Sequence, residues 1–172
     1  SLTLNMSKTI AIAPALVELR RVTSDWGQGP SDAAFEEGTG ALAAIGDATW
    51  QHTFFNTQFW TNEGGDYSAT LSASQVIGGL GFYTWGSTPQ MVADVQEWLI
   101  TPANNFGWIL VGDEKSPGTA RRFDTREINI PAFLPQLMID FTTPVAPAVS
   151  PSGLVVMAAL LTMMTGLVLV RT

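Results

Sequence analysis

Three arginines lie within the most charged stretch of the sequence, which runs from residue 121 to residue 127. A guanidinium group can bind a carboxylate through two parallel hydrogen bonds, so such side chains suit the carboxylates of an acidic sugar. The competing interpretation is an internal ion pair, in which Arg126 pairs with Glu127 or Asp124. The stretch therefore gives three candidate ligand-binding residues, which are Arg121, Arg122 and Arg126.

The six tryptophans offer a second kind of sugar contact, because the face of an indole ring matches the apolar C–H face of a pyranose. Core packing is the competing use of such large side chains, so we expect at most one or two of them to be exposed. Trp50 shares a predicted strand face with His52 and Phe54, and either this face packs into the core or it is partly open. The candidates for sugar stacking are Trp26, Trp60 and Trp85.

Acidic side chains in the loops could supply oxygen ligands to a structural calcium ion of the kind that pins loops in β-sandwiches. No EF-hand spacing is present, and solvated loop acids are the default interpretation. The candidate metal ligands are Asp113, Glu114 and Asp124.

No arrangement of residues in the sequence indicates catalysis. Glycoside hydrolysis needs two carboxylates across a cleft, and the acids of this chain show no motif of defined spacing. His52 is the only histidine and there is no cysteine, which excludes a multi-histidine or thiolate metal site. The net charge of −7 repels a phosphate backbone, so nucleic acid is a poor partner. We expect a protein that is not an enzyme and needs no cofactor.

The composition predicts an all-β fold, because the chain combines nine Phe, six Trp and two Tyr with sixteen Gly and ten Pro. We expect a long surface loop over residues 24–46 and a glycine-rich connection over residues 78–85. A continuous apolar run at residues 106–112 indicates a central strand. The other expected strands are residues 1–6, 17–22, 47–55, 69–76 and 137–141.

One short helix is predicted after Thr88, which can cap it, with Pro89 in the first helical position. Asp94 and Glu97 are expected to face away from the sheets. The helix should therefore lie on the surface of the sandwich. Its predicted apolar stripe consists of Met91, Val92, Val95, Trp98 and Leu99.

The C-terminal part of the sequence predicts a membrane or sorting segment. Residues 144–152 form a linker that contains three prolines, which resists packing. The run from Gly153 to Val170 carries no charge, and its length is at the lower limit of about 18 residues for a helix that spans a bilayer. Arg171 follows it and is expected on the cytoplasmic side, which leaves the sandwich outside.

Six segments, taken in order, resemble the DNRLRE domain, which is also described as carbohydrate-binding module family ninety-six. The resemblance covers about residues 2–141, and the tail resembles the C-terminal sorting signals of the PEP-CTERM and IPTL-CTERM type. The segments are Arg21–Gly29, Gly46–Trp50, Gly64–Asp66, Met91–Leu99, Asn105–Trp108 and Arg122–Glu127.

The resemblance implies a secreted, non-catalytic, jelly-roll-like β-sandwich that in some members binds an acidic polysaccharide such as alginate. Such domains usually carry further N-terminal strands. Residues 1–6 already alternate like a strand and no signal peptide is visible, so the chain is expected to begin inside the fold. If the further strands are missing, the sandwich has an unpaired edge and an incomplete binding face.

The sequence thus predicts a sandwich over residues 1–143, a linker over 144–152 and a hydrophobic segment over 153–172. The expected function is carbohydrate binding at a bacterial cell surface, with a polysaccharide or the extracellular matrix as partner. The membrane, and a sorting protease that removes the tail, are the further expected partners. The alternative is a structural surface or matrix protein without a sugar ligand.

Overall fold

The computed structural model describes residues 1–10, 13–32, 40–113 and 115–143. Residues 1–139 form one compact unit, and a second unit begins at residue 140. The predicted linker over residues 144–152 and the predicted segment over 153–172, with Gly153, Val170 and Arg171, lie outside the described residues. No helix in the described ranges is both long enough and apolar enough to cross a membrane.

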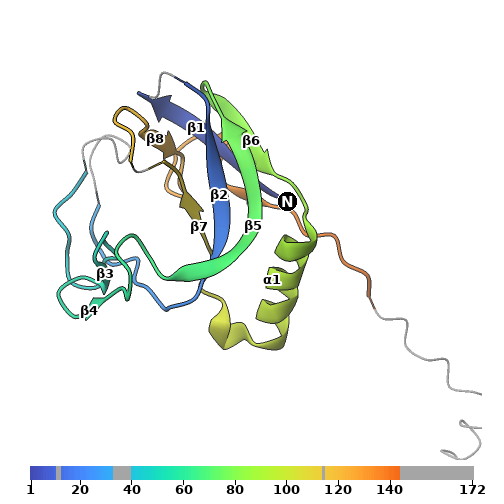
Figure 1. Ribbon diagram of the computed structural model, residues 1–172, viewed down its shortest axis with the longest axis horizontal. Helices are drawn as coiled ribbons and strands as arrows, with labels where there is room; N and C mark the ends of the chain where they lie inside the picture. Colours follow the sequence, from blue (N-terminus) through green and yellow to red (C-terminus); the bar gives the residue numbers. More distant parts are fainter. Residues whose placement is uncertain (11–12, 33–39, 114, 144–172) are drawn as a thin grey trace, which may run out of the picture. The chain divides into compact units, whose positions relative to one another are not determined.

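The first sheet has four antiparallel strands, with β1 (Leu2–Thr9) between β6 (Gly81–Trp85) and β8 (Arg121–Phe123) (Figure 1). The short strand β9 (Gln136–Leu137) also pairs with β1. Strand β1 is therefore paired along both sides.

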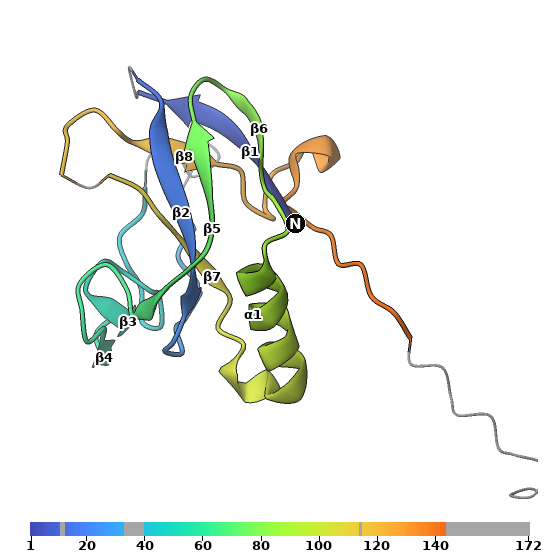
Figure 2. The same cartoon turned by 45° about the vertical axis from the view of Figure 1, so that its right-hand side comes forward.

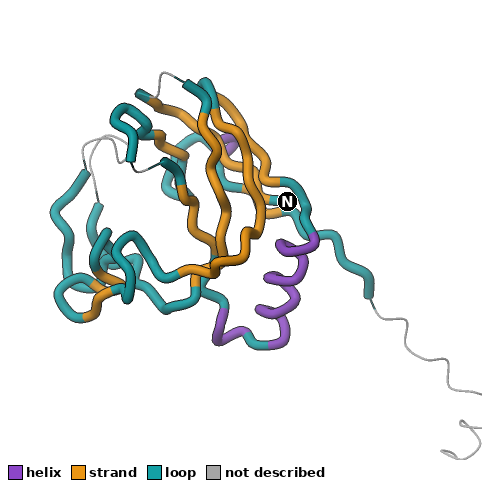
Figure 3. Tube along the Cα trace, in the orientation of Figure 1, coloured by secondary structure: helices purple, strands orange, loops and turns teal. Residues whose placement is uncertain are grey.

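The second sheet has three antiparallel strands, in which β2 (Ala15–Val22) lies between β5 (Tyr67–Ile77) and β7 (Trp108–Val111). A separate hairpin consists of β3 (His52–Phe54) and β4 (Gln58–Phe59). Figure 3 shows these strands with the loops that join them. Three helical elements complete the described structure, and they are α1 (Pro89–Ile100) and the 3₁₀ turns η1 (Pro102–Asn104) and η2 (Pro131–Phe133).

The hydrophobic core joins the two sheets and α1. Alternate residues of β1 and of β2 point into it, as the period of two along a strand requires. Trp85 is completely buried, and its indole Nε1 donates a hydrogen bond to the carbonyl of Val17 across the core at 3.1 Å. The buried core residues are Leu4, Met6, Val17, Leu19, Ala73, Ile77, Trp85 and Met91.

Helix α1 begins as predicted, because the Thr88 hydroxyl accepts a hydrogen bond from the Met91 amide at 3.0 Å and Pro89 follows the cap. The same hydroxyl donates to the carbonyl of Ser72 on β5, which ties the helix start to the second sheet. The helix then lies beside β5 (Figure 2). The local capping signal was therefore sufficient to place this element.

The predicted orientation of α1 is wrong at three positions. Asp94 was expected to face solvent, yet it is only 2% exposed. Ser72 Oγ and Trp108 Nε1 donate to its Oδ2 at 2.6 and 2.8 Å, which compensates for the loss of water. Val92 and Leu99 of the predicted apolar stripe are exposed instead.

The mostly β fold with one short α-helix agrees with the all-β prediction. Strands β1, β2 and β5 confirm the strands expected there. The glycine-rich connection is wrong over its second half, because residues 81–85 form β6 and pair with β1. Strand β7 is an edge strand of half-buried residues, so the expected central strand is also wrong.

The remaining strands are shorter than the sequence patterns indicated. Of residues 47–55 only His52–Phe54 form a strand, because the backbone around Asp47 is committed to loop hydrogen bonds with residues 44 and 55. Of residues 137–141 only Leu137 pairs, together with Gln136 before it. A run of β-forming residues extends as a strand only where a partner strand continues beside it.

Candidate functional site

An open pocket of about 440 Å³ lies beside β8, on the compact unit. One wall is the irregular segment of residues 28–32, and the other consists of residues 122–125 and 127–129. Both walls are loop or strand-end segments held against a sheet, which is the usual place for a binding site. Most lining residues are polar, so the pocket suits a polar ligand.

The floor of the pocket is a hydrogen-bonded network between β1 and the end of β8. Asn5 Nδ2 donates to Asp124 Oδ2 at 2.7 Å, and the Ser7 hydroxyl donates to Asp124 Oδ1. Asn5 and Ser7 share one side of β1 because they are two residues apart. The Asp124 amide also donates to the Asn5 carbonyl at 2.9 Å. The buried Asp124 carboxylate is therefore held in place by hydrogen bonds from β1.

Arg122 joins this network from β8. Its Nε and Nη2 donate to the Ser7 hydroxyl oxygen at 3.2 and 2.9 Å, so one edge of the guanidinium group already binds the protein. The half-buried side chain lines the pocket. Phe123, between Arg122 and Asp124, packs its ring edge-on against Trp85 in the core. The alternation of β8 thus anchors one residue in the core and places its two neighbours at the pocket.

The wall formed by residues 28–32 is held in place by Asp47. The backbone N–H of Ala44 donates to Asp47 Oδ2 at 2.6 Å, and the N–H of Ser31 donates to Oδ1 at 3.3 Å. These hydrogen bonds, that from Ala44 first, lower the pKa of Asp47 below its ordinary value. Gly29 has a φ of 63°, and a Cβ there would lie 1.8 Å from Asp47 Oδ1. Only glycine fits at this position.

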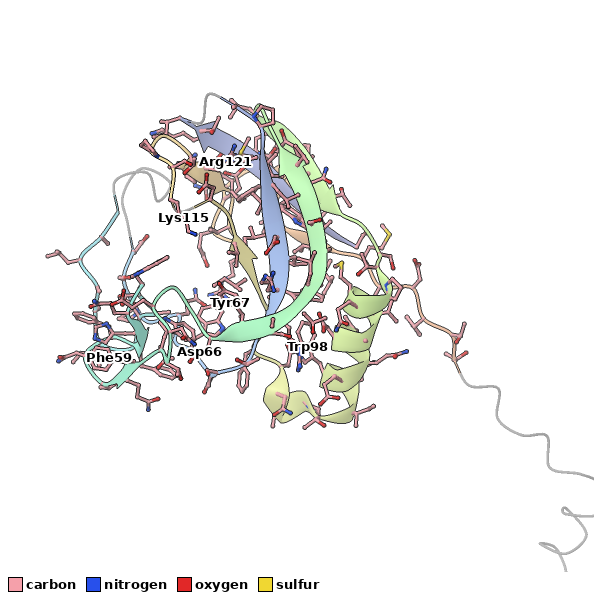
Figure 4. The ribbon with its side chains drawn as sticks, viewed as in Figure 1. Phe59, Asp66, Tyr67, Trp98, Lys115 and Arg121 are labelled. Atoms are coloured by element: carbon pink, nitrogen blue, oxygen red, sulfur yellow. The ribbon has the colours of Figure 1, made fainter. Side chains whose placement is uncertain are left out.

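The three candidate arginines have three different surroundings. Arg121 donates to the carbonyls of Thr119 and Ala13 at 2.8 and 2.9 Å, and it is labelled in Figure 4. Arg126 Nε lies 2.7 Å from Glu127 Oε1, so the internal ion pair is the interpretation that holds for Arg126. Only Arg122 lines the pocket. The expected arginine cluster does not form one binding face.

The candidate tryptophans do not line the pocket. Trp85 is completely buried in the core, so the prediction that it faces a ligand is wrong. Trp60 is half-buried and donates from Nε1 to the Thr49 carbonyl at 2.9 Å. Trp26 is 43% exposed and donates to the Phe106 carbonyl at 2.9 Å. The candidates therefore have separate hydrogen-bonding partners and form no shared stacking surface at the pocket.

Trp50 decides between the two alternatives left open for its strand face. It is 56% exposed, so that face is partly open. Its ring lies directly over Gly64, where a Cβ would come within 2.8 Å of the indole. The glycine pair at residues 64 and 65 was the available signal, since both have positive φ and leave the backbone open to a ring.

The candidate metal ligands lie in different environments. Asp113 accepts from the amides of Lys115 and Ser116 in a turn, and the Ser116 hydrogen bonds are the first cause that lowers the pKa of Asp113. Asp124 belongs to the pocket floor, and Glu114 lies outside the described residues. Nowhere in the described ranges do three His, Asp or Glu side chains converge as a metal site.

The pocket carries more negative than positive groups. Asp32, Asp124 and Glu127 line it together with the single guanidinium group of Arg122. Exposed amide and hydroxyl groups from Gln28, Ser31, Thr125 and Asn129 complete the polar lining. This arrangement can both donate to and accept from ligand hydroxyl groups.

No family model matches the chain, and no match was found among curated proteins or solved structures. The pocket beside β8 is thus the described feature on which a function can be proposed.

Proposed function

We propose that this chain is a non-catalytic carbohydrate-binding module on the outside of a bacterial cell, with the pocket beside β8 as its binding site. The observation that carries the proposal is an open polar pocket that presents carboxylate, amide, hydroxyl and guanidinium groups from fixed segments. Sugar hydroxyls can donate hydrogen bonds to the carboxylates and accept them from the amide, hydroxyl and guanidinium groups. A jelly-roll-like arrangement of the two sheets belongs to the same proposal.

The carboxylates of the pocket support binding rather than hydrolysis. Both Asp124 oxygens already accept hydrogen bonds from Asn5 and Ser7. Glu127 is paired with Arg126. A glycosidase instead needs one carboxyl group held protonated and a second one poised as base or nucleophile. The three pocket carboxylates fit the role of fixed acceptors for hydroxyl groups.

Affinity electrophoresis of the chain in gels that contain neutral or acidic polysaccharides tests the proposal. The double change Gln28→Ala and Asn129→Ala removes two exposed pocket amides, and we expect it to abolish the retardation seen for the unchanged chain. The matched control is Gln58→Ala with Gln96→Ala, which removes two exposed amides that do not line the pocket. The proposal is contradicted if no polysaccharide retards the unchanged chain, or if both double variants lose the retardation equally.

A structural role without a sugar ligand is the second candidate, and the outer face of the second sheet favours it. Leu16 on β2 and Val76 on β5 are register partners, and both are at least half exposed. Strands β5 and β7 are the edges of that sheet and offer unpaired backbone groups. Light scattering over a range of protein concentrations tests this candidate. Assembly that Leu16→Lys abolishes supports it, and a monomer at all concentrations contradicts it.

The C-terminal segment extends the first proposal to the membrane. Residues 153–170 carry no charge, so we propose that they anchor the module or direct its sorting, with Arg171 on the cytoplasmic side. Expression with and without residues 153–172, followed by cell fractionation, tests this role. We expect the full chain with the membranes or on the surface, and the truncated chain in a soluble fraction. Equal distribution of both contradicts it.

A further inference from the structure

We infer that the pocket beside β8 selects an uncharged, hydroxyl-rich sugar and discriminates against uronates. This inference rests on the proposed carbohydrate-binding function and names the ligand class of the same site. It departs from the acidic polysaccharide that the arginine-rich stretch suggested, and three features of the pocket carry it.

The first feature is the balance of charge. Asp32, Asp124 and Glu127 line the pocket, opposed by Arg122. Arg126 is paired with Glu127, yet even when that pair is counted as neutral, two carboxylates remain against one guanidinium group. A uronate would bring a further negative charge into this site, where like charges repel. An uncharged sugar brings none.

The second feature is the state of the arginines. The Nε and Nη2 atoms of Arg122 form the edge that best suits a bidentate carboxylate, and both donate to Ser7. Arg121 is bound to backbone carbonyls of Thr119, Ala13 and Ile77. Each of the three arginines that could have held a uronate therefore binds another part of the protein.

The third feature is the set of groups that line the pocket and remain exposed. The carboxylate of Asp32 is exposed at the pocket and can accept from two neighbouring sugar hydroxyls. Glu127, whose Oε1 pairs with Arg126, is exposed beside it and can accept as well. The amides of Gln28 and Asn129 are exposed beside them and can both donate and accept. Vicinal hydroxyl groups of a neutral pyranose match such a lining, whereas a carboxylate needs donors alone.

Isothermal titration of the full chain with matched oligosaccharide pairs tests the inference. Alginate and polygalacturonate oligosaccharides are compared with the same oligosaccharides after reduction of their carboxyl groups to alcohols, and cellohexaose is added as a third neutral probe. We expect the neutral members to bind at least about tenfold more tightly than their uronate partners. Their affinity should change little with salt, because no net charge is paired on binding.

Pocket variants sharpen the test. We expect a smaller preference for the neutral sugar over the uronate in Asp32→Asn and in Glu127→Gln. Each change removes one repelling charge and so raises the uronate affinity relative to the neutral affinity. The matched control is Glu63→Gln, because Glu63 is an exposed carboxylate that does not line the pocket. It should leave the preference unchanged.

The outcomes separate the two ideas. If the native uronates bind more tightly than their reduced partners, and Arg122→Gln weakens uronate binding, the inference is overturned. The proposed function then still stands. Binding of no member of any pair overturns the proposed function and the inference with it. A preference that changes equally in Glu63→Gln and Glu127→Gln overturns the assignment to this pocket.

Discussion

Two buried aspartates mark two regions of the molecule that use the same chemical group differently. Asp94 lies where α1 meets the second sheet, and it accepts hydrogen bonds from Ser72, Gln90 and Trp108. Asp124 lies at the end of β8 and accepts from Asn5 and Ser7 of β1. Both carboxylates are compensated for the loss of water, and the difference between them is in what covers them.

Aromatic side chains cover the Asp94 region. The rings of Trp98 and Trp108 are 4.5 Å apart in an edge-to-face arrangement, and Trp98 reaches from α1 toward the sheet in Figure 4. The Asp124 region instead opens into the polar pocket. Arg21 Nε on β2 also lies 3.6 Å from Asp94 Oδ1, so this buried carboxylate joins α1 to the second sheet. Asp124, at the floor of an open pocket, instead supports a surface that can meet a ligand.

Trp85→Ala should give the largest effect, because it leaves a cavity in the core that joins both sheets. We expect a loss of about 3 to 5 kcal/mol in the free energy of unfolding. Trp50→Ala is the matched control, since Trp50 is more than half exposed and should cost much less. Urea denaturation measures both changes. Equal losses in the two variants would contradict the structure, in which the Trp85 indole is buried and the Trp50 indole is exposed.

Asp94→Ala should be the next most damaging change, because it leaves the Ser72 hydroxyl and the Trp108 indole without their acceptor. We expect a loss of about 3 kcal/mol, as for a broken buried charged network. Asp124→Ala should cost about 1 to 2 kcal/mol for its hydrogen bonds and should also reduce sugar binding. Thermal unfolding and titration with cellohexaose measure the pair. A reversal of the two stability losses would remove the distinction between the regions.

The neighbouring arginines of β8 sharpen the comparison within one strand. Arg121 binds three backbone carbonyls, two of them from distant parts of the chain. Arg121→Gln should therefore cost about 1 to 2 kcal/mol of stability and leave sugar binding intact. Arg122→Gln should cost less stability and change the affinity of the pocket. Unfolding and binding are measured for both variants. A large stability loss in Arg122→Gln alone would contradict the assignment of Arg121 to stability and Arg122 to binding.

The smallest effect concerns the loop carboxylates. Burial raises the pKa of Asp66, but the amides of Thr61 and Asn62 and the hydroxyls of Thr61 and Ser24 outweigh it, and the net pKa lies below the ordinary value of 3.8. The pKa of Asp47 is lowered in the same direction. The unfolded chain then binds protons more readily than the folded chain near pH 4, so this stability is present above that pH.

These carboxylates should therefore lose their contribution as the pH falls through the lowered pKa values. Unfolding midpoints measured from pH 6 down to pH 2 should decrease, and the decrease should be shallower in the double variant Asp47→Asn and Asp66→Asn. A double variant with the same slope as the unchanged chain would contradict the assignment.

The sequence determined those features that depend on neighbours along the chain. Thr88 and Pro89 placed the start of α1, because an N-cap needs only a hydroxyl three residues before the amide that it accepts from. The alternation of residues placed β1 and, less regularly, β2, and the small, polar run after a glycine turn placed β5. The ion pair between Arg126 and Glu127 was foreseen as an alternative, since adjacent side chains can meet without help from the fold.

Only the tertiary structure decided the orientation of Asp94 and the position of the pocket. Asp94 faces inward because Ser72 on β5 and Trp108 on β7 donate hydrogen bonds to it there, from positions 22 and 14 residues away along the chain. The Asn5–Asp124 hydrogen bond at the pocket floor joins residues 119 positions apart. Such contacts depend on which strands pair and in which register, and a local pattern of polar and apolar residues does not contain that information.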